Sequence, residues 1–191
     1  MELIFATNNK HKLEEIKKIL PSHIVLLRLA DIGYTDDIEE TGATFEANAA
    51  IKANTIFLKT GKPCFADDSG MAVDFLNGNP GVRSARYAGE PANDKNNVKL
   101  LLKELEGVSN RNASFNTVIC YRTEKTELFF EGEIKGTVAD KPRGLYGFGY
   151  DPIFIPNGHD MTFAEMMLDQ KNSMSHRKLA VEKLINYLTS L

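Results

Sequence analysis

The chain of 191 residues has little cysteine, no tryptophan and no long apolar run. Its two cysteines, Cys64 and Cys120, stand in apolar, strand-like stretches without the spacing of a metal or disulfide motif. We therefore expect two buried thiols in a reducing compartment. The apolar run after Met1 is too short for a secretory signal, and no stretch is long enough to span a bilayer. These absences favour a soluble, cytoplasmic protein with no membrane partner.

A strong excess of charge of one sign is also missing. The net charge is −3 at pH 7 and the isoelectric point is about 5.8. Nucleic-acid-binding domains usually carry a large basic surface, so we expect no nucleic-acid partner. A small anionic ligand remains compatible with this balance, because a few local cations suffice to bind one. Length and composition are those of a globular domain, with enough chain for one core or two lobes.

The spacing of apolar residues predicts strands that alternate with helices. The predicted strands cover 2–6, 23–29, a strand into a turn over 63–70, and a long antiparallel pair over 112–138. Helices are predicted after residue 10, over 44–61, around 98–105 and after residue 175. Thr44 is a suitable N-cap and Gly61 a suitable stop, while Thr162 and Glu165 form a capping-box pattern. The pattern is typical of a mixed α/β protein with helices packed on a partly antiparallel sheet.

The first candidate site is the polar segment that follows the first predicted strand. It consists of Thr7, Asn8, Asn9, Lys10, His11 and Lys12. Free N–H groups and the positive dipole at a helix start attract phosphate, and the two lysines add formal charge. The segment lacks the glycines of a P-loop. The alternative is an ordinary capped helix start with solvated lysines.

Two acidic doublets form the second candidate. Glu39-Glu40 precedes a predicted helix, and Asp67-Asp68 follows an apolar run before Ser69-Gly70. Mg²⁺ prefers oxygen ligands, usually one or two carboxylates completed by water and substrate phosphate. The alternative for Asp-Asp-Ser-Gly is a simple turn, which these residues also favour.

The third candidate is the glycine-rich segment from Gly144 to Pro152. Its glycines allow a ligand to approach the backbone closely, and Phe148 between two glycines suits stacking on a flat base. Asp151, extended before proline, can accept a hydrogen bond from a ring N–H. The alternative is a glycine-rich bend with Phe148 folded into the core.

The fourth candidate is the segment from Lys171 to Arg177 at the start of the last predicted helix. A histidine and an arginine in the first turn need an explanation, because the positive end of the helix dipole disfavours cations. Both side chains can donate hydrogen bonds to a carbonyl on a base edge. The alternative is an exposed helix cap.

Together these motifs resemble one family over essentially the whole chain. TNNKHK, EETGATFEANAAIKA, ADDSG, PGVRSARYAG, FGYDPIF and KNSMSHR occur in the order and spacing of the inosine triphosphate pyrophosphatase family. Members of this family hydrolyse ITP, dITP and XTP to the monophosphate and pyrophosphate, which clears non-standard purine nucleotides from the pool. The resemblance implies one domain over residues 1–191. It also implies an elongated mixed sheet flanked by helices, with two lobes around a nucleotide-binding cleft, one Mg²⁺ per subunit and a homodimer.

The resemblance also implies a role for each motif residue. Asp68 is expected to be the catalytic acidic residue and a Mg²⁺ ligand, with Glu39 as the companion ligand, although the choice over Glu40 rests on alignment alone. Substrate binding is assigned to the triphosphate segment Thr7, Asn8, Asn9, Lys10, His11 and Lys12, the phosphate contacts Lys52 and Ser69, the base-stacking residues Phe148, Gly149, Tyr150 and Asp151, and the base readers Lys171, His176 and Arg177.

Base chemistry agrees with this reading. Hypoxanthine and xanthine carry a carbonyl at C6, where adenine carries an amine, so donors from His176 and Arg177 would pair with the first two only. A buried mismatch costs about 1–3 kcal/mol, enough for tenfold or greater discrimination. GTP carries the same C6 carbonyl, so its exclusion requires a pocket that penalises the 2-amino group. Two alternatives stay open: a pyrophosphatase with another base preference, and a nucleotide sensor without turnover.

Overall fold

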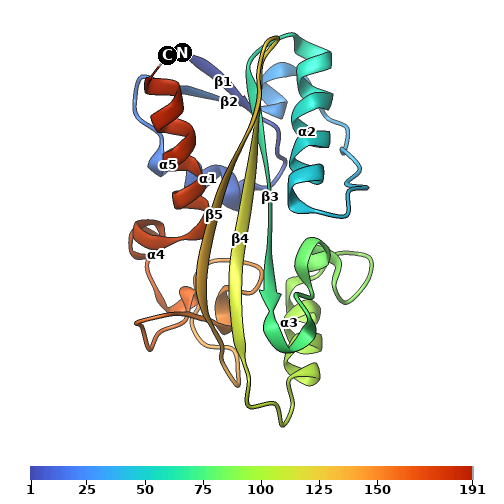
Figure 1. Cartoon of the computed structure of the whole chain (residues 1–191), viewed down its shortest axis with the longest axis vertical. Helices are drawn as coiled ribbons and strands as arrows, with labels where there is room; N and C mark the ends of the chain where they lie inside the picture. Colours follow the sequence, from blue (N-terminus) through green and yellow to red (C-terminus); the bar gives the residue numbers. More distant parts are fainter. Residues whose placement is uncertain (191) are drawn as a thin grey trace. The chain divides into compact units, whose positions relative to one another are not determined.

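The computed structural model describes residues 1–190 and contains one mixed sheet flanked by helices (Figure 1). Its six strands lie in the order β2-β1-β3-β4-β5-β6. Strand β1 pairs in parallel with β2 and β3, whereas β5 pairs antiparallel with β6. The predicted α/β class with a partly antiparallel sheet is therefore confirmed. The strands are β1 (Glu2–Phe5), β2 (Val25–Arg28), β3 (Cys64–Val73), β4 (Asn112–Arg122), β5 (Glu127–Val138) and β6 (Phe154–Pro156).

The helices begin and end largely where local signals predict. Thr44 Oγ1 accepts a hydrogen bond from Ala47 N–H, and Gly61 ends the second helix with φ of 64°. Across residues 1–190, no helix is long and apolar enough to cross a membrane. The helices are α1 (Lys10–Ile19), α2 (Phe45–Thr60), α3 (Asp94–Glu104), α4 (Leu168–Met174) and α5 (His176–Thr189).

The chain divides into two compact units. Unit 1 comprises Met1–Asp68, Thr117–Gly132 and the chain from Arg177 on, and unit 2 comprises Ser69–Asn116 and Glu133–His176. Strands β3, β4 and β5 each contribute residues to both units. The division therefore falls inside these strands and in the first turn of α5, and not at a linker.

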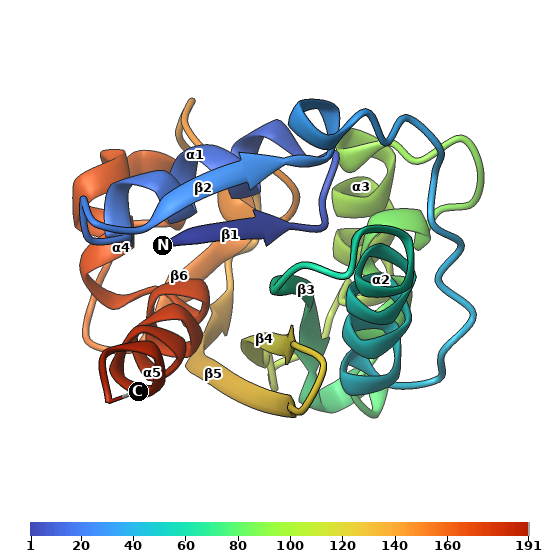
Figure 2. The same cartoon turned by 90° about the horizontal axis from the view of Figure 1, so that it is seen from above.

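Residue parity along the strands organises the core of unit 1. Leu3 and Phe5 of β1 pack in one cluster with residues of α1 and α5, whereas Ile4 packs in another cluster with residues of α2. On β3, Phe65 belongs to the first cluster and Ala66 to the second. Figure 2 shows α5 and α2 on opposite sides of these strands. Alternate side chains of a strand point to opposite faces, so the parity of a β3 residue decides which helices its side chain meets.

The sequence prediction of a turn at Asp67-Asp68-Ser69-Gly70 is wrong. Strand β3 continues through these residues to Val73. Both aspartate side chains are almost fully buried, and each has hydrogen-bonding partners from neighbouring helices. These tertiary contacts compensate the buried carboxylates, so they override the local turn preference of the segment.

Unit 2 has its own core of aromatic residues. The Phe115 ring packs edge-on against Phe154 at 4.7 Å between centroids and stacks on Phe163 at 6.0 Å. The capping box predicted at Thr162 is confirmed, because Thr162 N–H donates to Glu165 Oε2 at 2.7 Å. It starts a short 3₁₀ turn that positions Phe163 in this core.

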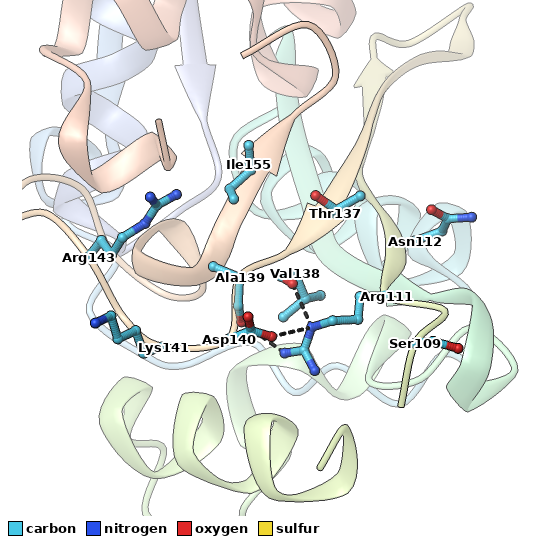
Figure 3. A pocket seen from close by; sticks show the side chains of 10 residues that line it. All are labelled: Ser109, Arg111, Asn112, Thr137, Val138, Ala139, Asp140, Lys141, Arg143 and Ile155. Carbon is cyan, nitrogen blue, oxygen red and sulfur yellow. Dashed lines mark hydrogen bonds and ion pairs between the residues drawn. The ribbon is translucent and has the colours of Figure 1, made fainter. Parts of the chain in front are cut away.

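A polar pocket of about 440 Å³ also lies in unit 2 (Figure 3). Arg111 lines it and donates hydrogen bonds to the backbone oxygens of Leu105, Val138 and Ala139 at 2.8–2.9 Å. The guanidinium therefore holds the end of β5 against the residues that follow α3. No sequence motif predicts this pocket. Arg111 has a structural role in it, because its guanidinium is bonded to backbone oxygens.

Candidate functional site

The side chain of Asn9 caps the start of α1. Asn9 Oδ1 accepts hydrogen bonds from the N–H groups of His11 and Lys12, at 3.0 and 3.1 Å. Thr7 Oγ1 accepts from Asn9 N–H, and Asn8 Nδ2 donates to Asp37. The helix cap of this segment is therefore confirmed, whereas the expectation of solvated lysines is wrong for Lys12, which pairs with the buried Asp67. Its binding of phosphate stays a prediction, for which the exposed Lys10 and the partly exposed Lys12 provide the charge.

A buried cluster of charges lies beside this helix start. Lys12 Nζ contacts both carboxylate oxygens of Asp67, at 3.1 and 3.0 Å, and Arg177 Nε donates to Asp67 Oδ2 at 3.3 Å. Arg177 also forms a buried ion pair with Glu15. We call these four residues, Lys12, Glu15, Asp67 and Arg177, the Asp67 cluster. Only Lys12 retains appreciable exposure, at 14% of its side chain.

Helix spacing explains how the Asp67 cluster forms. Lys12, Glu15 and the buried Ile16 lie within one turn of α1, so they share a face. Arg177 precedes Val181 and Leu184 of α5 by four and seven residues, on the stripe that faces the core. This answers the question raised by a cation in the first turn of α5: Arg177 is paired with two carboxylates in unit 1. Its predicted role as a base reader stays a prediction, and these contacts do not support it.

The pKa values in the cluster reflect burial against pairing. Burial alone raises the pKa of the Asp67 carboxyl, but the charges of Lys12, Arg177 and Lys52 outweigh it and hold that pKa well below its ordinary value. Burial lowers the pKa of Lys12, and Asp67 opposes that change. Asp67 is thus an anion that favours the charged form of both neighbouring cations.

Asp68 meets a different set of partners, from the α2 side of β3. Its Oδ2 accepts a hydrogen bond from Asn48 Nδ2 at 3.0 Å, and Asn48 Oδ1 accepts in turn from Gly42 N–H at 2.7 Å. This second bond fixes the orientation of the Asn48 amide. A Cβ at Gly42 would collide with Asn48, so the glycine permits the close approach. Asn48 was missed in the sequence, where it reads as one polar residue in an otherwise apolar helix face.

Lys52 and Glu40 complete the surroundings of Asp68. Lys52 is buried on α2, donates to the backbone oxygen of Asp67 at 2.6 Å and forms an ion pair with Glu40. Burial raises the pKa of Asp68, Lys52 and Lys12 oppose the rise, and Glu40 adds to it. Glu40 is half-buried, whereas Glu39, the predicted metal ligand, is exposed. The structure therefore brings Glu40 within electrostatic range of Asp68.

The predicted base-binding residues, apart from Arg177, lie in unit 2. Asp151 Oδ2 accepts hydrogen bonds from Phe148 N–H at 2.9 Å and from Lys171 Nζ at 2.6 Å. The Lys171 ammonium lies over the Phe148 ring at 4.9 Å from its centroid and over Phe163 at 5.5 Å. Gly147 has φ of 76°, and a Cβ there would collide with Asp151. The Asp151 carboxylate thus fixes the glycine-rich loop and holds the Lys171 ammonium against the Phe148 ring.

The remaining predicted residues of unit 2 differ in exposure. Tyr150 is buried and its hydroxyl donates to Ser84 O at 2.9 Å, while Gly149 N–H donates to Asp94 at 2.8 Å. The His176 ring is buried and stacks on Phe115 at 4.7 Å between centroids. Ser69 is half-buried. The predicted residues are thus divided between unit 1 and unit 2. Glu15 of the Asp67 cluster was missed, because in the sequence it resembles any charged residue of a helix.

Comparison with known proteins identifies the chain's relatives. A family model described as the Ham1 family matches residues 3–187. A dITP/XTP pyrophosphatase of Flavobacterium psychrophilum is 50% identical over 187 residues, with 98% of each chain covered. One of Bacillus licheniformis is 51% identical over 188 residues, covering 96% of this chain and 95% of the other.

Solved structures give the same answer. A HAM1 protein from Coxiella burnetii superposes with a TM-score of 0.92 at 41% identity and full coverage of both chains. The Ham1 protein of Staphylococcus aureus gives a TM-score of 0.91 at 38% identity, covering 100% of this chain and 99% of the other. The family model and these relatives show that this chain belongs to the Ham1 family.

Proposed function

We propose that this protein hydrolyses ITP, dITP and XTP to the nucleoside monophosphate and pyrophosphate. Relatives at 50% identity over nearly the whole chain carry the name dITP/XTP pyrophosphatase. The observation that carries the proposal is the position of Asp68, a buried carboxylate held by Asn48 and flanked by the charges of Lys52 and Glu40. Such an arrangement of acid and cations suits the activation of water beside a phosphate chain.

Mg²⁺ is the proposed metal. In the part of the chain that the structure describes, no group of three or more His, Cys, Asp or Glu side chains is placed to hold a metal ion. Asp68 and one glutamate of the 39–40 doublet therefore provide a small oxygen donor set, which fits Mg²⁺ because this ion keeps water and phosphate among its ligands. Resemblance favours Glu39, whereas the ion pair of Glu40 with Lys52 and its effect on Asp68 favour Glu40.

The proposed chemistry is hydrolysis of the anhydride between the α- and β-phosphates. Bound Mg²⁺ would neutralise negative charge on the phosphate oxygens. Asp68 orients the attacking water and accepts its proton as the anhydride bond breaks, and pyrophosphate leaves. Lys12 and Lys52 balance the charge that develops on the leaving group, with Lys10 at the exposed helix start.

Base selection is assigned to unit 2. Phe148 would stack on the purine, and Lys171, whose ammonium lies over the same ring, keeps its predicted role as a reader of the base and its neighbourhood. The predicted role of His176 as a reader remains part of this proposal. Tyr150 and Asp151 act through the loop, because their side chains bind Ser84, Phe148 and Lys171.

The first test is pyrophosphate release with Mg²⁺ from ITP, XTP, dITP, ATP, GTP and dTTP, with a metal-free control. We expect hypoxanthine and xanthine nucleotides to be hydrolysed roughly 5–150-fold faster than ATP, since a mismatched buried donor costs about 1–3 kcal/mol. Equal rates across bases would leave the hydrolase and remove the selectivity. Absence of pyrophosphate release, with nucleotide binding retained, would favour the sensor alternative.

We further propose that the protein acts in the cytoplasm as a homodimer, as the family resemblance implies. Light scattering of the purified chain tests the assembly, and a monomeric mass would contradict it.

A further inference from the structure

The two adjacent aspartates of β3 meet different partners. Asp67 contacts Lys12 of α1 and Arg177 of α5, whereas Asp68 contacts Asn48 of α2. This matches the parity of the strand, because Phe65 packs with α1 and α5 and Ala66 packs with α2. The doublet is therefore not one acidic site with two equivalent ligands.

We propose that Asp67 is a positioning residue, which holds the Lys12 ammonium where it binds the phosphate chain while Asp68 serves the metal and the water. The inference rests on the proposed function and extends it to a residue to which neither the motif nor the comparisons give a role. Asp67 itself has no exposed side-chain surface, so it acts through Lys12.

The contacts around Lys12 explain why it needs such a partner. A lysine ammonium ends a flexible four-carbon stem and has no fixed geometry of its own. Two oxygens of Asp67 lie 3.1 and 3.0 Å from Nζ, and Arg177 Nε contacts Asp67 Oδ2 at 3.3 Å. Arg177 thus fixes the Asp67 carboxylate, and this carboxylate restricts the Lys12 ammonium. Lys12 keeps 14% of its side chain exposed, which leaves the ammonium accessible to a ligand.

A purely structural role for Asp67 is the competing explanation, and Glu15 separates the two. Glu15 and Asp67 are both buried carboxylates paired with Arg177, and Asp67 also contacts the Lys12 ammonium. Removing either charge leaves Arg177 with one buried carboxylate fewer. Glu15→Gln is therefore a matched control for the loss of a buried ion pair in the same cluster.

The experiment compares Asp67→Asn, Glu15→Gln, Lys12→Gln and the double variant Asp67→Asn/Lys12→Gln with the unmodified protein. Inorganic pyrophosphate serves as a competitive probe of the phosphate subsite in ITP turnover with Mg²⁺. We expect Asp67→Asn to raise the inhibition constant of pyrophosphate and the KM for ITP about tenfold or more. Glu15→Gln should change both by less than about twofold despite a similar loss of thermal stability, and Lys12→Gln should add less than about twofold in the Asp67→Asn background.

An unchanged inhibition constant in Asp67→Asn, or equal changes in Asp67→Asn and Glu15→Gln, would overturn the proposal. If Asp67→Asn does not fold, Asp67→Glu keeps the charge and displaces the carboxylate by one methylene. A folded Asp67→Glu with an unchanged inhibition constant would overturn it equally. Failure of the proposed function is distinguishable, because it appears as absence of ITP turnover in the unmodified protein.

Discussion

The two units contrast in how they bury charge. Unit 1 buries the four charged residues of the Asp67 cluster beside Lys52, whose ion pair with Glu40 is half-buried. The group in unit 2 has one buried ion pair, Lys171 with Asp151, enclosed by aromatic rings and a glycine-rich loop. The first arrangement suits a polyanion and a metal, and the second suits a flat, neutral base. Under the proposed function, phosphate handling and base selection draw on separate sets of residues, so variants should separate them.

Asp68→Asn should have the largest effect. The amide keeps the shape of the carboxylate, but it cannot accept a proton from water. Turnover should therefore fall about 10²–10⁴-fold. Nucleotide affinity, measured by calorimetry with ITP, should stay within a few-fold. Asn116→Ala, a partly buried polar residue of unit 2, is the control. Retention of more than a tenth of the turnover would remove Asp68 from its assigned role.

Arg177→Met tests the stability of unit 1. It leaves Glu15 and Asp67 as buried carboxylates without their shared cation, which should cost about 3–5 kcal/mol of unfolding free energy. Denaturant unfolding measures the loss. Lys178→Met is the matched control, since the neighbouring Lys178 forms a partly exposed pair with Glu182 worth no more than about 1 kcal/mol. Similar losses in both variants would contradict a buried cluster.

The glutamate doublet can be resolved by Glu39→Gln and Glu40→Gln. Loss of a metal carboxylate should raise the Mg²⁺ concentration for half-maximal turnover about 10–100-fold. Binding of Mn²⁺ in the absence of nucleotide, followed by electron paramagnetic resonance, gives a second readout. A larger effect in Glu40→Gln follows from its position beside Lys52 and Asp68, whereas a larger effect in Glu39→Gln follows from the family resemblance.

Phe148→Leu should have a smaller effect, confined to the base. Loss of stacking should cost about 1–3 kcal/mol of transition-state stabilisation. The value of kcat/KM for ITP should therefore fall roughly 5–150-fold. Inhibition by inorganic pyrophosphate should not change, because this probe has no base. Tyr146→Leu, an exposed aromatic two residues earlier, is the control. A rise in the pyrophosphate inhibition constant for Phe148→Leu would show that the two sets of residues are not separate.

Local signals made much of the fold predictable. Thr44, Gly61 and the capping box at Thr162 act through nearby backbone groups, so the sequence predicts their roles correctly. Strand β3 was predicted to end too early, because the partners of Asp67 and Asp68 come from helices far away in the sequence. Turn preference is local, and the compensation of two buried carboxylates is not.

The same distinction explains the candidate site. The motifs predict which residues form the site, because residue types and their order can be read from the sequence. They cannot show that Arg177 pairs with Glu15 and Asp67, or that Asn48 is fixed by Gly42, because these contacts join segments that only the fold brings together. The prediction of Arg177 as a base reader rested on its place at the helix start, its hydrogen-bond donors and the family resemblance, none of which reveals its contact with α1.

The most direct test of the division between the units is the ratio of kcat/KM for ITP to kcat/KM for ATP. This ratio does not depend on the active fraction of a variant. The account predicts that Lys52→Met in unit 1 lowers both values and leaves the ratio within about twofold of the unmodified protein, because its contacts serve the phosphates of either substrate. His176→Phe in unit 2 should change the ratio by about fivefold or more, because it removes a donor assigned to the base carbonyl and keeps an aromatic ring against Phe115. A changed ratio in Lys52→Met together with an unchanged ratio in His176→Phe would contradict it.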